Sequence, residues 1–298
     1  MPELPEVETV RRGLQQHVAG RRIVRVEVGR ERVVRRTSRE ALIHGLTDVV
    51  VLSADRRGKY LLLPLDSGDS TMIHLRMSGQ VLLAAGDAPR PAHTHVALTL
   101  DDRRELWFVD PRTFGEVVVF DPDHVDVELP ELALLGIDPV ADPFERGDLA
   151  RIVRSTRRAL KPLLLDQHAI AGIGNIYADE ILHAARLRPD REASSLDGRA
   201  ITRLHTSIVE VLASAIVAGG STLGDAQYVD LMGSSGSYQD DHRVYGRTGE
   251  RCLTCGRGWI RRTVSGGRSP NMNAASQRIS ASKITLRHVC LQRVECGL

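Results

Sequence analysis

The 298-residue sequence lacks several features that would assign it to a broad class of protein at once. No apolar run approaches the roughly 18 residues of a membrane span. The acidic N-terminus has neither the basic nor the apolar region of a signal peptide. No internal repeat, Walker loop, dinucleotide fingerprint or Ser-His-Asp order stands out, which argues against the classes that those patterns mark. We therefore expect a cytoplasmic protein that does not associate with membranes.

Cysteine is absent before position 252, and the four cysteines that follow lie in a basic region. From residue 242 to the end, eleven lysines and arginines stand against two acidic residues. Cysteines gathered in one part of a cytosolic chain indicate a metal before a disulfide. The excess of positive charge suits a surface that faces nucleic acid, although a solvated basic tail would have the same composition.

The spacing of the cysteines predicts half of a zinc site. Cys252 and Cys255 form a CxxC pair of the kind that supplies two zinc ligands. A second such pair, expected about 15 to 20 residues later, is missing, and Cys290 follows only after 34 intervening residues. Cys290 and Cys296 either complete the site across a long loop or remain free thiols. We expect at most one zinc ion, in a structural role.

Hydrophobic periodicity divides the chain into a β-rich part and a helical part. Apolar residues at helical spacing predict an N-terminal helix that ends near Gly20. From about residue 22 to residue 120, eight short apolar runs separated by turn residues predict a β-sandwich or barrel. Proline and aspartate mark 121–147 as a linker. Helical patterns follow over 149–166, 175–187 and 198–219, and the Gly- and Ser-rich stretch 219–242 predicts a mobile surface loop.

The predicted helix over 149–166 is basic and precedes a glycine-containing turn. Its cations are Arg151, Arg154, Arg157, Arg158 and Lys161, and no acidic partner follows them before Asp166. Residues 151, 154, 158 and 161 would share one helix face, which we expect to contact phosphates rather than solvent alone. In the turn, Gly172 and Gly174 would let backbone N–H groups approach an anion, and Asn175 would cap the next helix, although most such turns only join helices.

Three carboxylates follow a proline at the start of the chain. Pro2, Glu3, Glu6 and Glu8 fit an ordinary helix start, because proline and negative charge are both favoured in a first turn. Removal of Met1 would instead leave Pro2 as a secondary amine with a pKa of about 8. Such an amine is a nucleophile at neutral pH. The N-terminus alone leaves both interpretations open.

Lys59 and three histidines lie in or beside the predicted strands. Lys59 starts an apolar strand, where a lysine can serve only to protect a sheet edge. His74, His93 and His95 are isolated, and isolated histidines in strands are more often structural than catalytic. The residues by themselves therefore predict a nucleic-acid-binding protein with a candidate amine nucleophile.

Seven motifs occur together in an order that points to one family. They are MPELPEVETVRRGL, RRGKYLLL, HLRMSGQ, DPRTFG, KPLLLDQ, GIGNIYADE and VYGRTGERCLTCG. Over roughly residues 1 to 269 the chain resembles bacterial formamidopyrimidine-DNA glycosylases. The resemblance implies an α+β multidomain protein. Its parts would be an N-terminal β-sandwich with an N-terminal helix (1–135), a helix-two-turns-helix domain (136–238) and a C-terminal β-hairpin zinc-finger-like module (239–298) that diverges after residue 269.

The resemblance also implies the chemistry of base excision repair. Pro2 would attack C1′ of a damaged nucleotide flipped from the duplex, expel the base and form a Schiff base with the sugar. Glu3 would protonate the ring oxygen of the sugar, Glu6 would support these groups, and Lys59 would assist base release and β-elimination. Arg268 matches the finger arginine associated with δ-elimination. The implied enzyme is a bifunctional glycosylase and abasic-site lyase with no redox cofactor or catalytic metal.

The DNA contacts carry over from the family in the same way. Met77, Arg112 and Phe114 match the side chains that fill the gap left by the flipped base, with Arg112 facing the orphan cytosine and Phe114 wedging the stack. Residues that match phosphate contacts are His93, Arg157, Lys161 and Asn175. The loop 222–238 matches the segment that covers the everted base. The implied partner is double-stranded DNA with oxidised bases or abasic sites, and we expect a monomer.

The family features stop after Ser269, where unrelated sequence replaces the second CxxC. Either a frameshift produced this ending, which we favour, or a divergent tail closes the zinc site with Cys290 and Cys296. The zinc content and the placement of Arg268 depend on the answer. Two other functions remain open: excision of oxidised pyrimidines, as in the related endonuclease VIII type, and binding of damaged DNA without catalysis. PELPE together with the gap-filling residues favours oxidised purines.

Overall fold

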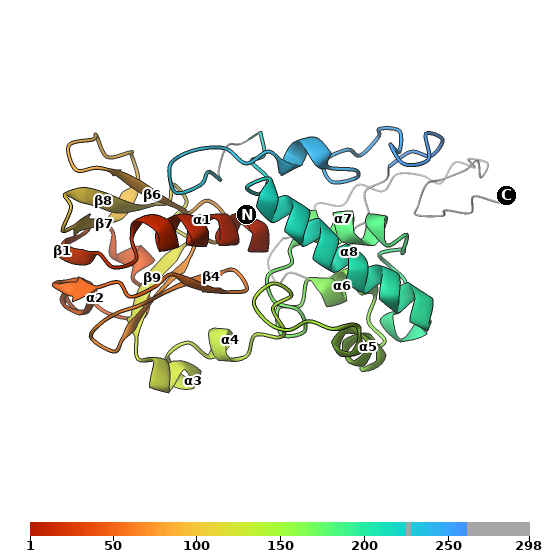
Figure 1. Cartoon of the computed structure of the whole chain (residues 1–298), viewed down its shortest axis with the longest axis horizontal. Helices are drawn as coiled ribbons and strands as arrows, with labels where there is room; N and C mark the ends of the chain where they lie inside the picture. The colour runs from red at the N-terminus through yellow and green to blue at the C-terminus, as the bar shows by residue number, and fades with distance from the viewer. Residues whose placement is uncertain (225–227, 261–298) are drawn as a thin grey trace, which may run out of the picture.

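The computed structural model describes residues 1–224 and 228–260, and within them the chain forms a β-sandwich and a helical part. The sandwich lies at the left of Figure 1 and the helices at the right, with the N-terminus and α1 between them. The segment that follows α8 runs back along the top of both parts in the same view. The catalytic N-terminus that the sequence predicts is therefore at the junction of the two parts.

The sandwich consists of two antiparallel sheets. In the described residues the first sheet has the strand order β2-β1-β7-β8-β6, and the second has the order β3-β4-β5-β9. The strands are β1 (Arg22–Val28), β2 (Val49–Val50), β3 (Asp55–Arg57), β4 (Tyr60–Pro64), β5 (Ser70–His74), β6 (Gln80–Ala85), β7 (Thr94–Leu100), β8 (Arg104–Val109) and β9 (Glu116–Phe120). Each of the eight predicted runs contains a strand, so the predicted sandwich is confirmed.

Two helices pack into the core that the two sheets share. α1 (Leu4–His17) buries Val7, Val10 and Leu14 in the main core, as its periodicity predicts. α2 (Arg39–Leu46) was not predicted, although Ser38 caps it by accepting the N–H of Ala41 over 3.0 Å. The polar strand β3 was also missed, because its three residues have no apolar pattern and form a strand only by pairing with β4.

The segment 121–147 is more than a linker. It contains the short helices α3 (Val125–Glu128) and α4 (Pro130–Ala133). Leu129 and Leu132 pack on Met72 and Phe120 and so cover the outer face of the second sheet. This cover explains why every residue of β5 is buried, since the strand faces the core on one side and the connecting segment on the other.

The helical part contains α5 (Arg146–Arg154), α6 (Leu160–Leu164), α7 (Asn175–Ala184) and α8 (Gly198–Val217). The single helix predicted over 149–166 is wrong, because the chain is extended at Ala159. There the N–H groups of Leu160 and Lys161 donate to the carbonyls of Arg191 and Pro189 over 2.9 and 3.0 Å instead of continuing α5. Pro162 then fits the first turn of a new helix, where its missing N–H is no loss.

α8 is the one described helix that is long and apolar enough to cross a membrane, with a mean hydropathy of 1.4. Its residues Ile201, Leu204, Ile208 and Leu212 are buried in the core of the helical part. This burial is that of the core helix of a globular domain. The predicted domain limits at 135 and 238 stay predictions.

The stretch after α8 differs from the predicted mobile surface loop in its described residues. Tyr228, Leu231 and Tyr238 are buried, and the carbonyl of Leu231 accepts the N–H of Leu83 from β6 over 2.9 Å. These described residues are anchored to both parts of the molecule. The structure describes the predicted finger module only up to residue 260. In this part, one isolated antiparallel bridge joins Arg251 and Trp259.

Candidate active site

The start of α1 is fixed to the turn that precedes α7. The N–H of Leu4 donates to the carbonyl of Gly172 over 3.0 Å. Pro2 is buried, and it lines a small pocket together with Glu6 and Ser221. The predicted nucleophile therefore lies between the first helix of the sandwich and the loops of the helical part (Figure 1).

Glu3 caps the start of α7, although it lies 171 positions before Gly174 in the sequence. Its carboxylate accepts the backbone N–H groups of Gly174 at 2.8 Å, Ile176 at 2.9 Å and Tyr177 at 3.3 Å. A Cβ on Gly174 would lie 2.3 Å from the Glu3 carboxyl carbon, so only glycine permits this approach. The predicted capping role of Asn175 is therefore wrong. Gly174 is the N-cap residue, and Glu3 satisfies the free N–H groups at the positive end of α7.

Glu3 and Lys59 are both buried, and their charges act on each other. Burial raises the pKa of Glu3, while Lys59 and the three backbone N–H groups oppose that rise. Burial also lowers the pKa of Lys59, although the carboxylates of Glu3 and Glu6 favour its charged form. In both groups the low-dielectric surroundings favour the neutral form. Such opposed shifts suit a general acid and a general base in one site.

Glu6 occupies the same buried site, and its carboxylate accepts three hydrogen bonds. Its Oε2 accepts the N–H of Glu3 at 2.8 Å, and its Oε1 accepts the N–H of Ser221 at 2.7 Å and the hydroxyl of Tyr177 at 2.5 Å. Burial, followed by the negative charge of Glu3, raises the pKa of Glu6 to about 7. Glu6 therefore changes its protonation in the physiological range, which an ordinary helix carboxylate does not.

A buried aspartate holds the turn that carries Lys59. Asp138 accepts the N–H of Gly58 at 2.8 Å and both terminal nitrogens of Arg56 at 2.6 and 3.2 Å. Arg56 in turn donates to Glu8 at 3.1 Å, which gives the third N-terminal carboxylate a structural role. Sequence reasoning missed Asp138, because it lies 80 residues beyond Gly58 in what reads as a linker, and no local signal connects the two.

The residues predicted to fill the gap in the duplex project from two adjacent loops. Met77 and Phe114 are each 37% exposed, although both follow buried strands. The guanidinium of Arg112 lies 4.9 Å from the ring centre of Phe114. Asp110 is fully buried and joins the loops, because its carboxylate accepts the hydroxyl of Ser78 at 2.6 Å and the N–H of Arg112 at 3.1 Å.

Arg35 supports the loop of Phe114, and sequence reasoning missed it. Its guanidinium donates to the carbonyls of Thr113 at 2.9 Å and Phe114 at 3.0 Å. Thr113 has a positive φ of 53°, so the backbone here needs such outside support. His93, also exposed with a positive φ of 66°, accepts the N–H of Asp110 at its carbonyl over 3.1 Å. Nothing in the sequence marks the exposed Arg35 as the support of the Phe114 loop.

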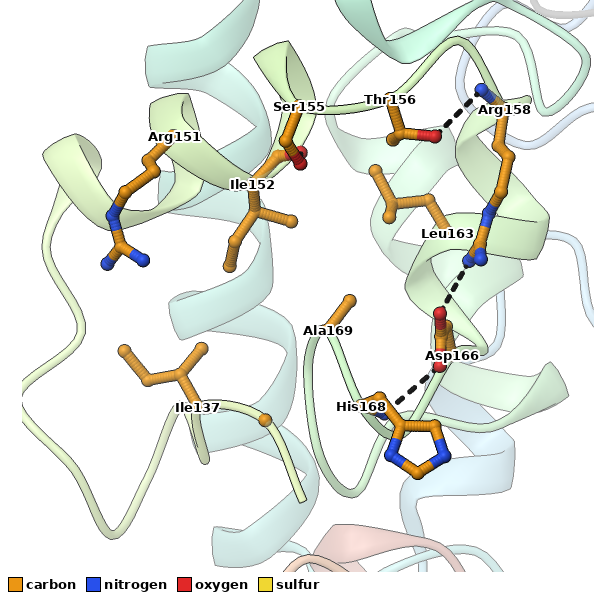
Figure 2. A pocket seen from close by; sticks show the side chains of 11 residues that line it. Ile137, Arg151, Ile152, Ser155, Thr156, Arg158, Leu163, Asp166, His168 and Ala169 are labelled. Atoms are coloured by element: carbon orange, nitrogen blue, oxygen red, sulfur yellow. Dashed lines mark hydrogen bonds and ion pairs between the residues drawn. The ribbon is translucent and has the colours of Figure 1, made fainter. Parts of the chain in front are cut away.

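A hollow in the helical part shows how Arg158 is used (Figure 2). It has a volume of about 370 Å³ and is lined by residues of α5, of the connection from α5 to α6, of α6 and of the turn after it, together with Gly136 and Ile137. Arg158 points to Asp166, with 2.8 Å between Nη2 and Oδ2, and Asp166 also accepts the N–H of His168. The predicted basic helix face is therefore wrong, because the break after α5 places Arg154 and Arg158 on different segments and Arg158 has a carboxylate partner.

The remaining cations of this segment differ in exposure. Lys161 is buried and pairs with Asp179 at 2.7 Å. Arg154 and Arg157 are exposed, and within the described residues neither has a carboxylate partner. Asn175 is exposed at the first position of α7. The phosphate contacts of Arg157, Lys161 and Asn175 stay predictions, and Lys161 would have to share its charge with Asp179.

The two described cysteines lie in one tight turn. Cys252 is buried, and Cys255 is partly exposed. The N–H of Gly258 donates to the sulfur of Cys255 at 3.5 Å, and the N–H of Cys252 donates to the carbonyl of Gly258 at 2.8 Å. Two thiols in such a turn fit two positions of a tetrahedral zinc site. Residues 1–224 and 228–260 contain no cluster of three metal-binding side chains. The predicted residues Arg268, Cys290 and Cys296 lie outside the described part of the chain.

Known proteins resemble this chain over most of its length. A family model for the formamidopyrimidine-DNA glycosylase N-terminal domain matches residues 1–117, and one for the H2TH domain of the same enzymes matches residues 135–227. The formamidopyrimidine-DNA glycosylase of Pelotomaculum thermopropionicum is 41% identical over 279 residues, which cover 94% of this chain and 100% of the relative. That of Salinispora arenicola is 46% identical over 260 residues, covering 86% and 89%.

Solved structures agree with the sequence comparisons. The Lactococcus lactis Fpg in complex with abasic-site DNA superimposes with a TM-score of 0.80 at 37% identity, over 89% of this chain and 96% of that one. A mutant of the same Lactococcus lactis protein in complex with Fapy-dG DNA superimposes with a TM-score of 0.81 at 37% identity, over 90% and 96%.

Proposed function

The chain belongs to the formamidopyrimidine-DNA glycosylase family, and from this membership we propose that it excises oxidised purines from double-stranded DNA and then cleaves the strand as an abasic-site lyase. The names of the relatives and the Fapy-dG and abasic-site DNA in the solved complexes support the substrate class. The observation that carries the proposal is the convergence of Pro2, Glu3, Glu6 and Lys59 in one buried site at the junction of the two parts.

Pro2 is the nucleophile of the proposed reaction once Met1 is removed. Its secondary amine attacks C1′ of the flipped nucleotide, and the bond to the base breaks as the new C–N bond forms. The amine loses its proton in this step. The C1′–O4′ bond then breaks as the ring oxygen is protonated, and the opened sugar is left as an iminium, which keeps its positive charge because its nitrogen carries no proton. That charge makes the iminium an electron sink for the elimination that cleaves the strand.

Glu3 and Lys59 supply the proton transfers of the proposed reaction. The raised pKa of Glu3 favours the protonated carboxyl that a general acid needs to protonate the sugar ring oxygen. The lowered pKa of Lys59 favours the neutral amine that can take up a proton during elimination. Glu3 has a second effect in the same position, because it ties the first residues of the chain to α7 and thereby orients Pro2.

Met77, Arg112 and Phe114 provide the proposed contacts to the duplex opposite the flipped nucleotide. Their exposure on loops held by the buried Asp110 supports this role, since apolar side chains that wedge a base stack have to project from a rigid support. Arg268 keeps its proposed part in δ-elimination, but its position lies outside the described residues.

Zinc is the one cofactor of this proposal, and its role would be structural. Cys252 and Cys255 would hold the ion, with Cys290 and Cys296 as the candidates for the remaining two positions. A small hairpin module buries too little apolar surface to fold alone, so the metal would supply its stability. Metal analysis of the purified chain tests this point. We expect less than one zinc per chain, and one tightly held zinc that is lost on mutation of Cys290 or Cys296 would show that the long loop closes the site.

Borohydride trapping on a duplex with one 8-oxoguanine opposite cytosine tests the proposed function. Reduction of the iminium should join the protein covalently to the DNA strand, and peptide mapping should place the bond at Pro2 with Met1 absent. Glu3→Gln should abolish base excision but keep duplex binding. Pro2→Gly retains an amine and should only weaken excision.

Two substrates separate the rival functions. Adducts on dihydrouracil duplexes at the same yield would indicate oxidised-pyrimidine chemistry. Specific binding of the 8-oxoguanine duplex with no adduct at any pH would indicate a damage-binding protein without lyase activity. Excision by Glu3→Gln at the parental rate would overturn the assignment of the acid.

A further inference from the structure

A continuous row of hydrogen bonds leads from Glu6 to a histidine near the base of the C-terminal module. The hydroxyl of Tyr177 lies 2.5 Å from Oε1 of Glu6 and 3.3 Å from Oγ of Ser221. Oγ of Ser221 lies 3.0 Å from Nε2 of His242. Tyr177 comes from α7, Ser221 from the loop after α8, and His242 from the start of the next segment. All four side chains are buried, with exposures of 0 to 7%.

The donors in this row can point in only one direction when Glu6 is ionised. A carboxylate only accepts, so Tyr177 donates its proton to Glu6. If all three hydrogen bonds are made, the oxygen of Tyr177 accepts from the hydroxyl of Ser221, and the oxygen of Ser221 accepts from a proton on Nε2 of His242. When Glu6 is protonated and donates to Tyr177, every bond can reverse. The two directions of the row therefore correspond to the two protonation states of Glu6.

We propose that His242, Ser221 and Tyr177 form a proton relay that loads and unloads the carboxyl group of Glu6. An imidazolium at His242, protonated on Nδ1 by solvent, passes its Nε2 proton to Ser221. Ser221 passes its hydroxyl proton to Tyr177, and Tyr177 passes its own to Oε1 of Glu6. The imidazolium becomes neutral, the carboxylate becomes a carboxyl, and both hydroxyls end with the proton count they had. The relay rests on the proposed function, because the Glu6 carboxyl that it serves lies beside the proposed nucleophile Pro2.

The charged groups around the two ends fit this role. Glu6 faces Glu3 at the N-cap of its own helix and Lys59 on the β3–β4 turn. Tyr228, from the segment after α8, also lies beside Glu6. All three are buried, so no solvent-exposed acid or base touches the Glu6 carboxylate among the described residues. His242 faces Glu180 on α7 and the exposed Asp240 and Asp241 beside it in sequence. These three carboxylates attract protons to the histidine end. Burial nevertheless lowers the pKa of His242, so the ring releases a proton readily.

Tyr177 acts in the relay without ionising. Burial, together with the charge of Glu6, raises its pKa well above the ordinary value. A tyrosinate is therefore not an intermediate, and the proton on Tyr177 moves only as another arrives from Ser221. The relay therefore needs both Ser221 and His242, because the loss of either side chain would interrupt the concerted proton transfer.

His242→Gln tests the relay while keeping the hydrogen bond. A glutamine amide can donate to Ser221 but cannot carry a proton through, and Ser221→Ala removes the hydroxyl while keeping the backbone N–H that Glu6 accepts. His183→Gln is the matched control, because His183 is also a histidine of lowered pKa whose Nε2 lies 2.8 Å from a hydroxyl, that of Thr254, away from Glu6.

Single-turnover excision of 8-oxoguanine between pH 5 and 9 is the first measurement. We expect His242→Gln and Ser221→Ala each to slow excision by about tenfold near pH 7, less than the 10²–10⁴ of a group that acts on substrate directly, and to shift the pH profile. The double variant should be no slower than either single one. Unchanged profiles in both variants, or the same shift in His183→Gln, would overturn the relay.

Exchange of the Tyr177 hydroxyl proton with solvent, followed by NMR in the free protein, is the second measurement. The relay predicts slower exchange in His242→Gln and Ser221→Ala than in the wild type and the His183→Gln control. This readout needs no DNA, so an inactive wild type would refute the proposed function but leave the relay to be decided here. Equal exchange in all four proteins would overturn it.

Discussion

Glu6 is a single residue whose protonation the fold moves into the physiological range. In an unfolded chain its carboxyl has the ordinary pKa of 4.5, and in the folded protein burial and Glu3 raise that pKa to about 7. From pH 4.5 to 7 the folded state therefore holds a proton that the unfolded state has released. The contribution of Glu6 to stability is complete below pH 4.5 and is lost as the pH rises through 7.

Glu6→Gln removes this pH dependence. We expect the unfolding free energy of the wild type, minus that of the variant, to fall by about 3 kcal/mol between pH 4.5 and pH 8 and to level off above pH 7. Urea unfolding of both proteins across this range measures it. Taking the difference between the two proteins cancels the titrating groups that do not interact with Glu6. A difference that stays constant with pH would show that Glu6 keeps an ordinary pKa in the folded state.

Among the elements, α7 depends on a cap that its own sequence does not supply. Gly174→Ala would place a methyl group 2.3 Å from the carboxyl carbon of Glu3 and push that side chain from three backbone N–H groups. We expect a loss of about 1–3 kcal/mol in stability and a loss of base excision, because Glu3 leaves its position beside Pro2. Thermal unfolding and the excision assay measure the two effects.

Gly198→Ala is the matched control for this change. Gly198 begins α8 as Gly174 precedes α7, but a Cβ there meets nothing within 4 Å. We expect an unchanged excision rate and stability that stays equal or rises by up to about 1 kcal/mol, since alanine favours a helix over glycine. Full activity in Gly174→Ala would mean that Glu3 can act without its contact to α7.

The loop that carries Phe114 depends on Arg35 in a similar way. Arg35→Ala removes the donors to the carbonyls of Thr113 and Phe114. We expect overall stability to change little, while affinity for an abasic-site duplex falls about fivefold to tenfold, as for a hydrogen-bond loss of about 1 kcal/mol. Preference for cytosine over adenine opposite the lesion should fall too. Arg32→Ala is the control. It keeps the backbone carbonyl of residue 32, to which Arg35 also donates, and this variant should bind DNA like the wild type.

For the whole molecule, the formal net charge of only +2 means that DNA binding depends on where the cations lie. Arg157 is exposed, and in the described residues it has no carboxylate partner. Arg157→Ala should therefore weaken binding on every sequence and reduce the slope of log affinity against log salt by about 0.9. Arg188→Ala makes the same charge change at a residue that pairs with Asp190, and its slope should match the wild type. An unchanged slope in Arg157→Ala would show that Arg157 does not contact DNA phosphates.

The secondary structure of the sandwich was predictable because its signal is local. The bounds of β1, β6 and β9 agree with the predicted runs, since turn residues border alternating or continuous apolar residues. The break between α5 and α6 was not predictable in the same way. It depends on hydrogen bonds from Leu160 and Lys161 to residues about thirty positions later, which no helical period contains.

The candidate site divides along the same line. Pro2, Glu3 and Lys59 lie in motifs whose family resemblance implies catalytic roles, and the structure brings these residues together. Asp138 and His242 lie in no motif that sequence reasoning used, and only the structure shows their contacts with Gly58 and Ser221.

The sequence by itself determined the order of the parts, the periods of their helices and strands, and the presence of a proline and carboxylates at the N-terminus. These are properties of neighbouring residues, which a linear pattern records. Only the tertiary structure decided what those carboxylates do. Glu3 meets the start of α7 across 171 positions and Glu6 meets Ser221 across 215. Their pKa values depend on burial and on charges brought together over such separations, because desolvation and Coulomb interactions act through space and not along the chain.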